Sequence, residues 1–132
     1  MDPAAQPIHV LVVDDNDDMA TSMELLLRRE GYSVESAPNG AVALGRHLQR
    51  PADVLITDLL MPEKDGIEVI AHFRAEFPAV RIIAMSGGGT RVRGERYLST
   101  AAEIGADAIL KKPFEIAALL DTLRRVANGA AR

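Results

Sequence analysis

Short runs of aliphatic and β-branched residues alternate along the chain with longer segments in which apolar residues recur every three or four positions. The runs are typical of buried strands, and the longer segments are typical of amphipathic helices. The runs lie at residues 9–13, 33–37, 53–57, 80–85 and 107–110. Helical spacing follows each run, up to Gly31, over 41–50, and at about 67–77, 95–104 and 115–127. The pattern therefore predicts five consecutive strand and helix units.

Two of the predicted helices carry a clear apolar face. The apolar positions of the first helix are Met19, Met23, Leu26 and Leu27, and those of the last helix are Ile116, Leu119, Leu120 and Leu123. Residues three and four apart lie on the same side of a helix, so we expect each set to face a core. Met19 and Met23 are accordingly interpreted as packing residues.

Strict alternation of strands and helices predicts an α/β fold with a parallel sheet, because parallel strands need crossover helices that cover both of its faces. Ligands of such sheets bind beyond the carboxyl ends of the strands. The polar residues found there are Asp14 and Asp15 after the first strand, Asp58 after the third, Ser86 after the fourth, and Lys111 and Lys112 after the fifth. We therefore expect carboxylates, a hydroxyl and an ammonium group to converge on one edge of the sheet.

The first of these positions concentrates negative charge, with Asp14, Asp15, Asp17 and Asp18 surrounding a single Asn16. Like charges this close repel one another, but a hard divalent cation such as Mg²⁺ makes the same cluster favourable. An acidic residue after a strand can also simply cap a helix, and we assign that role to Asn16 or Asp17. This leaves Asp14 and Asp15 as the predicted metal ligands.

The third strand adds a carboxylate that can act as a nucleophile. With Mg²⁺ beside it, an oxygen of Asp58 can attack a phosphoryl group and form an aspartyl phosphate. Ser86 and Lys112 can then bind phosphoryl oxygens that the metal does not reach. Lys111 is interpreted as a solvated side chain.

Other polar residues are given structural interpretations. Asp65 before Gly66 is typical of a turn. The three histidines, His9, His47 and His72, have no acidic or cysteine partner at metal-ligand spacing in the sequence, and we expect them to be structural or exposed.

The composition limits the function classes. The 132 residues, 48% apolar and 26% charged, fit one globular domain, which we place at 1–132 with a core at about 8–128. A net charge of −4 disfavours direct nucleic-acid binding, and no cysteine is present for a disulfide or thiolate site. No signal peptide or membrane-length apolar run is found, so we expect a soluble, cytoplasmic protein without a membrane interaction.

Four motifs together carry a family resemblance. "VVDDN", "ITDLLMPEKDG", "IIAMSG" and "LKKPF", in this order, resemble the response-regulator receiver domain of two-component signalling over nearly the whole chain. The resemblance implies a flavodoxin-like (βα)5 fold with strand order 2-1-3-4-5. It also implies that Asp58 is the phosphoacceptor, and that Ser86 and Lys112 contact the phosphoryl group.

The resemblance further implies Mg²⁺ as the cofactor and names its ligands. Asp15, Asp58 and the backbone carbonyl of Leu60 are expected to bind the ion directly, with Asp14 close behind. The expected phosphoryl donor is a sensor histidine kinase or a phosphotransfer protein. A downstream protein target, not identified by the sequence, is expected to read the face formed by the fourth helix, the fifth strand and the last helix. We expect a monomer or a weak homodimer, with no fused output module.

Two alternatives compete with a phosphorylation switch. A phosphatase of the haloacid dehalogenase kind also uses an aspartyl nucleophile, but it needs a second acidic residue two positions later, where this chain has Leu60 after Asp58 and Asn16 after Asp14. A phosphate-independent adaptor is disfavoured because every expected site residue is present. We expect the chain to catalyse only its own phosphorylation and dephosphorylation.

Overall fold

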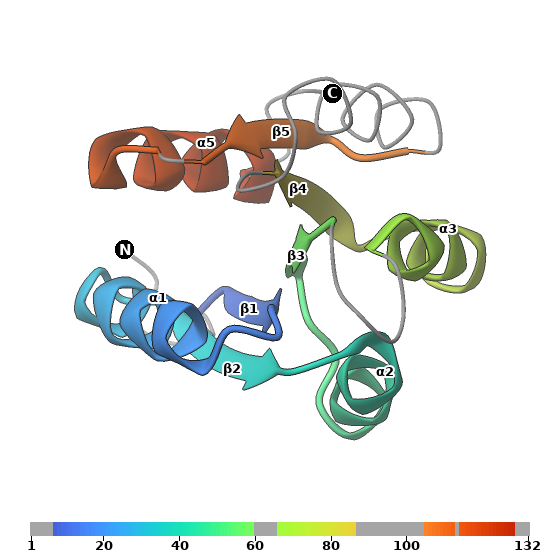
Figure 1. The fold of residues 1–132 in the computed structure, drawn as a ribbon. Coiled ribbons are helices and arrows are strands. Elements are labelled where there is room, and N and C mark those ends of the chain that lie inside the picture. Colours follow the sequence, from blue (N-terminus) through green and yellow to red (C-terminus); the bar gives the residue numbers. More distant parts are fainter. Residues whose placement is uncertain (1–6, 60–65, 87–104, 113, 129–132) are drawn as a thin grey trace.

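A computed structural model of the chain describes residues 7–59, 66–86, 105–112 and 114–128 (Figure 1). The strands are β1 (His9–Val13), β2 (Ser33–Ala37), β3 (Val54–Asp58), β4 (Arg81–Ser86) and β5 (Ala108–Lys111). The helices are α1 (Asp17–Arg29), α2 (Gly40–Gln49), α3 (Gly66–Glu76) and α5 (Ile116–Ala127). The predicted strands agree with these bounds to within one residue, whereas the helix predicted at 95–104 lies outside the described residues.

The five strands form one parallel sheet in the order β2-β1-β3-β4-β5. Helices α1 and α5 pack on one face of the sheet, and α2 and α3 pack on the other (Figure 1). Central strands β1 and β3 are buried along their whole length, as expected for strands covered on both faces. The predicted flavodoxin-like α/β fold is confirmed.

Most of the predicted helix faces are buried as expected. Met23 and Leu27 of α1 and Leu119 and Leu123 of α5 belong to one hydrophobic cluster. The prediction for Ile116 is wrong, because its side chain is 58% exposed. Ile116 is the first residue of α5, and it stands at the rim of a cavity instead of inside the packed cluster.

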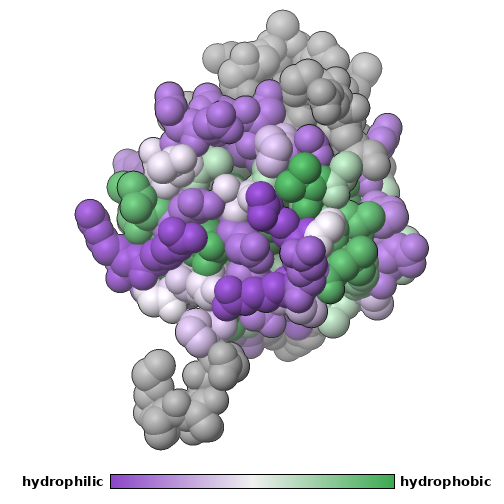
Figure 2. Space-filling view, turned by 90° about the horizontal axis from the view of Figure 1, so that it is seen from below, coloured by the Kyte–Doolittle hydropathy of each residue, from purple (hydrophilic) through white to green (hydrophobic). Residues whose placement is uncertain are grey.

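Helix α2 packs small residues and a histidine against the core. Its buried residues are Gly40, Ala43 and His47, while Leu48 is 65% exposed. Leu48 and Leu25 of α1 are separate exposed apolar residues, and Figure 2 shows hydrophobic areas scattered among hydrophilic atoms. Isolated exposed leucines of this kind are common on globular proteins.

The ends of α1 follow the predicted signals. The side-chain oxygen of Asn16 accepts a hydrogen bond from the Met19 amide at 3.0 Å, which confirms Asn16 as the N-cap. After the helix, Gly31 has φ 96°, a left-handed conformation that glycine adopts without strain. The cap matters for the site because it fixes how the chain leaves β1 and enters α1.

The histidines are buried or exposed as the sequence analysis expected, but one has an unforeseen partner. His9 is buried, and its Nε2 lies 2.9 Å from Glu35 while its Nδ1 lies 3.0 Å from the Ser33 hydroxyl. His47 is buried against Phe73, and its Nδ1 accepts a hydrogen bond from the Ala52 amide at 3.0 Å. These contacts lie away from the carboxyl ends of the strands and hold β1, β2 and α2 together.

His47 gives the fold a pH dependence. Its pKa lies below the ordinary value of 6.5, because burial disfavours the protonated ring and His9 adds a smaller effect of the same sign. The unfolded chain therefore binds the proton more readily than the folded protein. The contribution of the neutral His47 ring to the free energy of unfolding is complete above pH 6.5. It decreases as the pH falls from 6.5 toward the lower pKa that His47 has in the folded protein.

We expect His47→Asn, which keeps an acceptor for the Ala52 amide but does not titrate, to flatten the fall in the free energy of unfolding between neutral and mildly acidic pH. Urea unfolding at a series of pH values measures this slope. The exposed His72, changed to Asn, is the matched control and should leave the slope as in the wild type. Equal slopes for His47→Asn and the wild type would show that His47 is not the responsible group.

Within the described part of the chain, no helix is long and apolar enough to cross a membrane.

Candidate functional site

The predicted site residues stand at the carboxyl ends of four strands. Asp14 directly follows β1, Asp58 is the last residue of β3, Ser86 is the last residue of β4, and Lys112 directly follows β5. The parallel register places Asp58 beside Met85 and Ser86 beside Lys111. The convergence on one sheet edge that the sequence predicted is therefore present in the structure.

The three predicted carboxylate ligands of the metal form one cluster. One oxygen each from Asp14, Asp15 and Asp58 can be chosen so that all lie within 4.8 Å of one another. Asp14 and Asp58 are buried, at 1% and 7% exposure, whereas Asp15 is exposed. The cluster therefore has two fixed members in the protein wall and one member facing solvent.

Backbone hydrogen bonds hold Asp14 in place. Its amide donates to the Ala37 carbonyl at 3.1 Å, which extends the pairing of β1 with β2 by one residue. One of its carboxylate oxygens, Oδ1, accepts a hydrogen bond from the Asn16 amide at 2.9 Å. The other oxygen remains directed toward the rest of the site.

Lys112 supplies the positive charge of the site. Its Nζ lies 3.3 Å from Oδ2 of Asp14 and 3.7 Å from Oδ2 of Asp58. Because β4 lies between β5 and β3, this side chain spans the end of β4 to reach Asp58. The Lys112 amide also donates to the Ser86 carbonyl, which ties the residue after β5 to the end of β4. Lys111 is exposed and makes no part of this arrangement, as expected.

The donor set fits a hard divalent cation. Among the described residues, three carboxylates face one ammonium group, so the formal negative charge of this set is in excess by two. Carboxylate oxygens are the protein ligands that Mg²⁺ prefers, and the exposed Asp15 leaves an open side where bound water can complete the coordination. Residues Asp14, Asp15 and Asp58 would hold the ion, which when bound would neutralise the oxygens of an incoming phosphoryl group.

Some predicted features lie outside the described residues. These are the Leu60 carbonyl as a metal ligand, the turn at Asp65 and the helix at 95–104.

The sequence analysis missed one residue on which the site depends. Gly66 begins α3 and donates its amide to the Leu59 carbonyl at 3.0 Å, directly behind Asp58. A Cβ at Gly66 would overlap the Asp58 carbonyl oxygen and would lie 2.6 Å from the Leu59 Cα. The sequence predicts a turn at Asp65, which lies outside the described residues, and the close backbone contact at Gly66 was not part of that prediction.

Fold and site together define a class of protein. The family model of the response regulator receiver domain matches residues 10–124 of the sequence, and the chain belongs to this family.

Among curated proteins, the response regulator ArlR of Staphylococcus epidermidis is 34% identical over 120 residues, which are 89% of this chain and 52% of the relative. The transcriptional regulatory protein PrrA of Mycobacterium tuberculosis is 37% identical over 123 residues, or 91% of this chain and 50% of the relative. The chain thus spans about half the length of these curated relatives.

Two solved structures of similar proteins match along nearly their whole length. The chemotaxis protein CheY4 of Vibrio cholerae has a TM-score of 0.80 at 29% identity, covering 92% of this chain and 99% of its own. The signal receiver domain of a response regulator from Bermanella marisrubri has a TM-score of 0.80 at 34% identity, covering 93% and 100%. The receiver fold of the chain is therefore shared with solved members of the family.

Proposed function

We propose that the chain is a Mg²⁺-dependent switch that accepts a phosphoryl group on Asp58. Receiver-domain membership implies exchange with a histidine kinase or a phosphotransfer protein. The observation that carries the proposal is the arrangement of Asp58, whose carboxylate lies within 4.8 Å of two other carboxylates and 3.7 Å from the Lys112 ammonium group.

The proposed chemistry is a single phosphoryl transfer. An Asp58 carboxylate oxygen forms a bond to phosphorus while the phosphorus–nitrogen bond of the donor phosphohistidine breaks, and the electron pair stays on the imidazole nitrogen. Lys112, already beside Asp58, binds a phosphoryl oxygen as negative charge enters the site. Ser86 supplies a hydroxyl at the end of the neighbouring strand. The chain catalyses no reaction other than its own phosphorylation and dephosphorylation.

Incubation with acetyl phosphate and Mg²⁺, followed by intact mass measurement, tests the proposal. A single stable phosphoryl adduct supports the switch. Catalytic turnover of a phosphoester would favour the phosphatase alternative, and an unchanged mass would favour the phosphate-independent adaptor.

We propose that a downstream protein binds the surface formed by β5, α5 and the predicted helix at 95–104. The described part of this surface is connected to the site, because Lys112 links β5 to Asp58 and its amide binds the Ser86 carbonyl. A change at Asp58 that moves Lys112 therefore acts on both β4 and β5. A downstream protein would read the resulting change.

The charge excess predicts opposite effects of one substitution on stability and on metal binding. Asp15 is exposed and makes no ion pair with Lys112, so Asp15→Asn removes a repelling charge without breaking that pair. We expect the metal-free variant to melt at a higher temperature than the metal-free wild type. The same change should weaken Mg²⁺ binding by about tenfold or more.

Thermal melts with and without Mg²⁺, and metal titration by calorimetry, measure the two effects. The stabilisation that saturating Mg²⁺ gives the wild type by mass action should be smaller in Asp15→Asn. Asp17→Asn changes an exposed first-turn residue of α1 outside the carboxylate cluster and is the control. Equal Mg²⁺ affinity in the wild type and Asp15→Asn would rule out Asp15 as a ligand.

A further inference from the structure

A buried hydroxyl group lies one residue before the predicted phosphoacceptor. Thr57, in β3, has 0% exposure. The register of the sheet places it between Val13 of β1 and Ala84 of β4, and both of these residues belong to the hydrophobic cluster on the face of α2 and α3. The Thr57 hydroxyl therefore lies in an apolar layer that solvent does not reach.

Packing alone does not require this hydroxyl. Valine has nearly the same shape, favours strands as threonine does, and would fill the same place without the cost of burying a polar group. A buried hydroxyl is tolerated where it makes a hydrogen bond, and Oγ1 of Thr57 donates to the carbonyl oxygen of Asp58 at 3.0 Å. The hydroxyl thus acts on the backbone of the phosphoacceptor itself.

The peptide bond that follows Asp58 is held at both of its polar groups. Its carbonyl oxygen accepts the hydrogen bond from Thr57, and its N–H group, the amide of Leu59, donates to the Met85 carbonyl at 2.9 Å. Because a peptide bond is planar, two hydrogen bonds on its opposite edges fix the rotation of the plane. They also fix the direction in which the Asp58 side chain leaves the strand.

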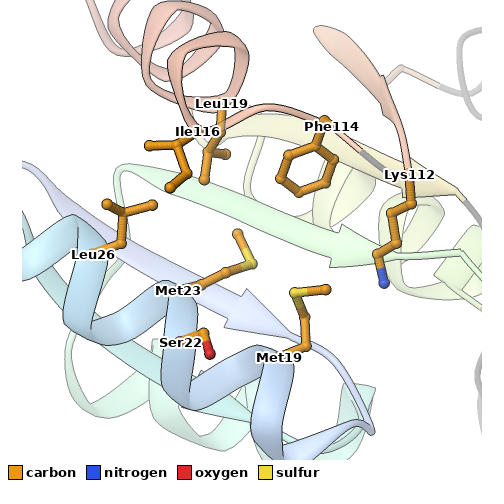
Figure 3. Close-up of a pocket in the computed structure, with 8 residues that line it drawn as sticks. All are labelled: Met19, Ser22, Met23, Leu26, Lys112, Phe114, Ile116 and Leu119. Carbon is orange, nitrogen blue, oxygen red and sulfur yellow. The ribbon is translucent and has the colours of Figure 1, made fainter.

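That direction matters because the groups around the Asp58 carboxylate come from other elements. Figure 3 shows the Lys112 side chain extending from beyond β5 to the end of β3, where its Nζ lies 3.7 Å from Oδ2 of Asp58. This distance exceeds the usual hydrogen-bond length, and the carboxylates of Asp14 and Asp15 repel that of Asp58. None of these contacts holds the carboxylate in one orientation, so a restraint on its backbone affects where it points.

We propose that Thr57 is a positioning residue for the phosphorylation of Asp58. Its hydroxyl holds the Asp58 backbone so that the carboxylate points into the cluster and toward an incoming phosphorus atom. This inference rests on the proposed function, but it also extends to metal binding, because Asp58 is one of the three clustered carboxylates. Thr57 acts through Asp58 and is not itself a catalytic residue.

Two substitutions separate the hydroxyl from the methyl group. Thr57→Val keeps the shape and removes the hydrogen bond, whereas Thr57→Ser keeps the hydroxyl and removes the methyl. We expect Thr57→Val to lower the maximal rate of phosphorylation by about tenfold or more, as is typical when a contact that orients a metal ligand is lost. The acetyl phosphate concentration that gives half the maximal rate should change little, and Thr57→Ser should keep close to the wild-type rate.

Intact mass measured over time, at saturating Mg²⁺ and a series of acetyl phosphate concentrations, gives both quantities. Circular dichroism sets a temperature at which every variant is folded. Thr122→Val makes the same change at a threonine of α5 that is 5% exposed and lies outside the carboxylate cluster, so it is the matched control and should leave the rate unchanged.

A comparison with stability distinguishes positioning from a purely structural role. Thr57→Ser leaves a gap where the buried methyl was, so urea unfolding should show it to be less stable than the wild type. Its rate should nevertheless stay high, while that of Thr57→Val falls. A rate that followed the free energy of unfolding through the series would mean that Thr57 serves packing only.

Three further results would overturn the proposal. Thr57→Val could reach the wild-type maximal rate, Thr57→Ser could be as slow as Thr57→Val, or the change could be confined to the half-saturating concentration of acetyl phosphate. A wild-type protein that takes up no phosphate would contradict the proposed function instead. Mg²⁺ titration by calorimetry then decides the positioning role alone, because weaker binding in Thr57→Val but not in Thr57→Ser supports it and equal binding in both overturns it.

Discussion

Replacing Asp58 with Asn is expected to abolish the phosphoryl adduct completely. An amide oxygen is a far weaker nucleophile than a carboxylate, and the other two carboxylates of the cluster cannot replace Asp58. Asp14 already accepts the Asn16 amide and pairs with Lys112, and Asp15 stands exposed at the side of the cluster. Asp58 is thus the carboxylate that combines burial, a lysine partner and a position at the end of the central strand β3.

Intact mass measurement after exposure to acetyl phosphate and Mg²⁺ gives the result directly. Asp121→Asn makes the same chemical change on α5, where the aspartate is 66% exposed in a pair with Arg125, and it should be phosphorylated like the wild type. Uptake of phosphate by Asp58→Asn at the wild-type rate would show that another residue is the acceptor.

The strands and the catalytic edge were predictable from the sequence for a physical reason. A strand buried on both faces is mostly apolar, so β1 and β3 appear as runs of mainly aliphatic residues, and the first acidic residue marks the end of each run. In a parallel sheet all those ends lie on the same edge. The positions of Asp14 and Asp58 in the sequence therefore placed both on this edge, and the strand order implied by the family resemblance placed β1 beside β3.

The errors arose where a residue's surroundings depend on a distant element. Ile116 has the spacing of a core residue, but the space that it faces is the cavity next to α1, which no local pattern can reveal. His9 has no acidic neighbour in the sequence, and the Glu35 that binds it is brought there by the pairing of β1 with β2. The periodicity of a sequence shows which side of a helix or strand is apolar. It does not show which residues of other elements face that side.

Gly66 illustrates the same limit at the site itself. The Asp65 and Gly66 pair predicted a turn, which explains a glycine by its conformational freedom. In the structure the glycine is needed because α3 starts directly against the end of β3, where its amide binds the Leu59 carbonyl. This close approach of two backbones has no signal in a single sequence.

We therefore expect Gly66→Ala to be strongly destabilising. The new Cβ would overlap the Asp58 carbonyl oxygen and approach the Leu59 Cα to 2.6 Å, and both obstacles are backbone atoms that cannot rotate away. Either α3 or the end of β3 must move, at a cost of about 3 kcal/mol or more, at the upper end of the usual range for overpacking. For a chain of this length, that corresponds to a fall in melting temperature of about 10 °C.

The same displacement should reach the function, because the atoms that must move belong to Asp58 and its neighbour. We expect folded Gly66→Ala to bind Mg²⁺ more weakly and to be phosphorylated more slowly than the wild type, measured at a temperature where circular dichroism shows it folded. Gly45→Ala on α2 is the matched control, since its added Cβ has no atom within 4 Å apart from its chain neighbours and the nearby backbone of its own helix, and alanine favours the helix by roughly 0.5–1 kcal/mol. If Gly66→Ala were as stable as the wild type, the end of β3 could yield without cost, and the packing of α3 against it could not be what fixes the position of Asp58.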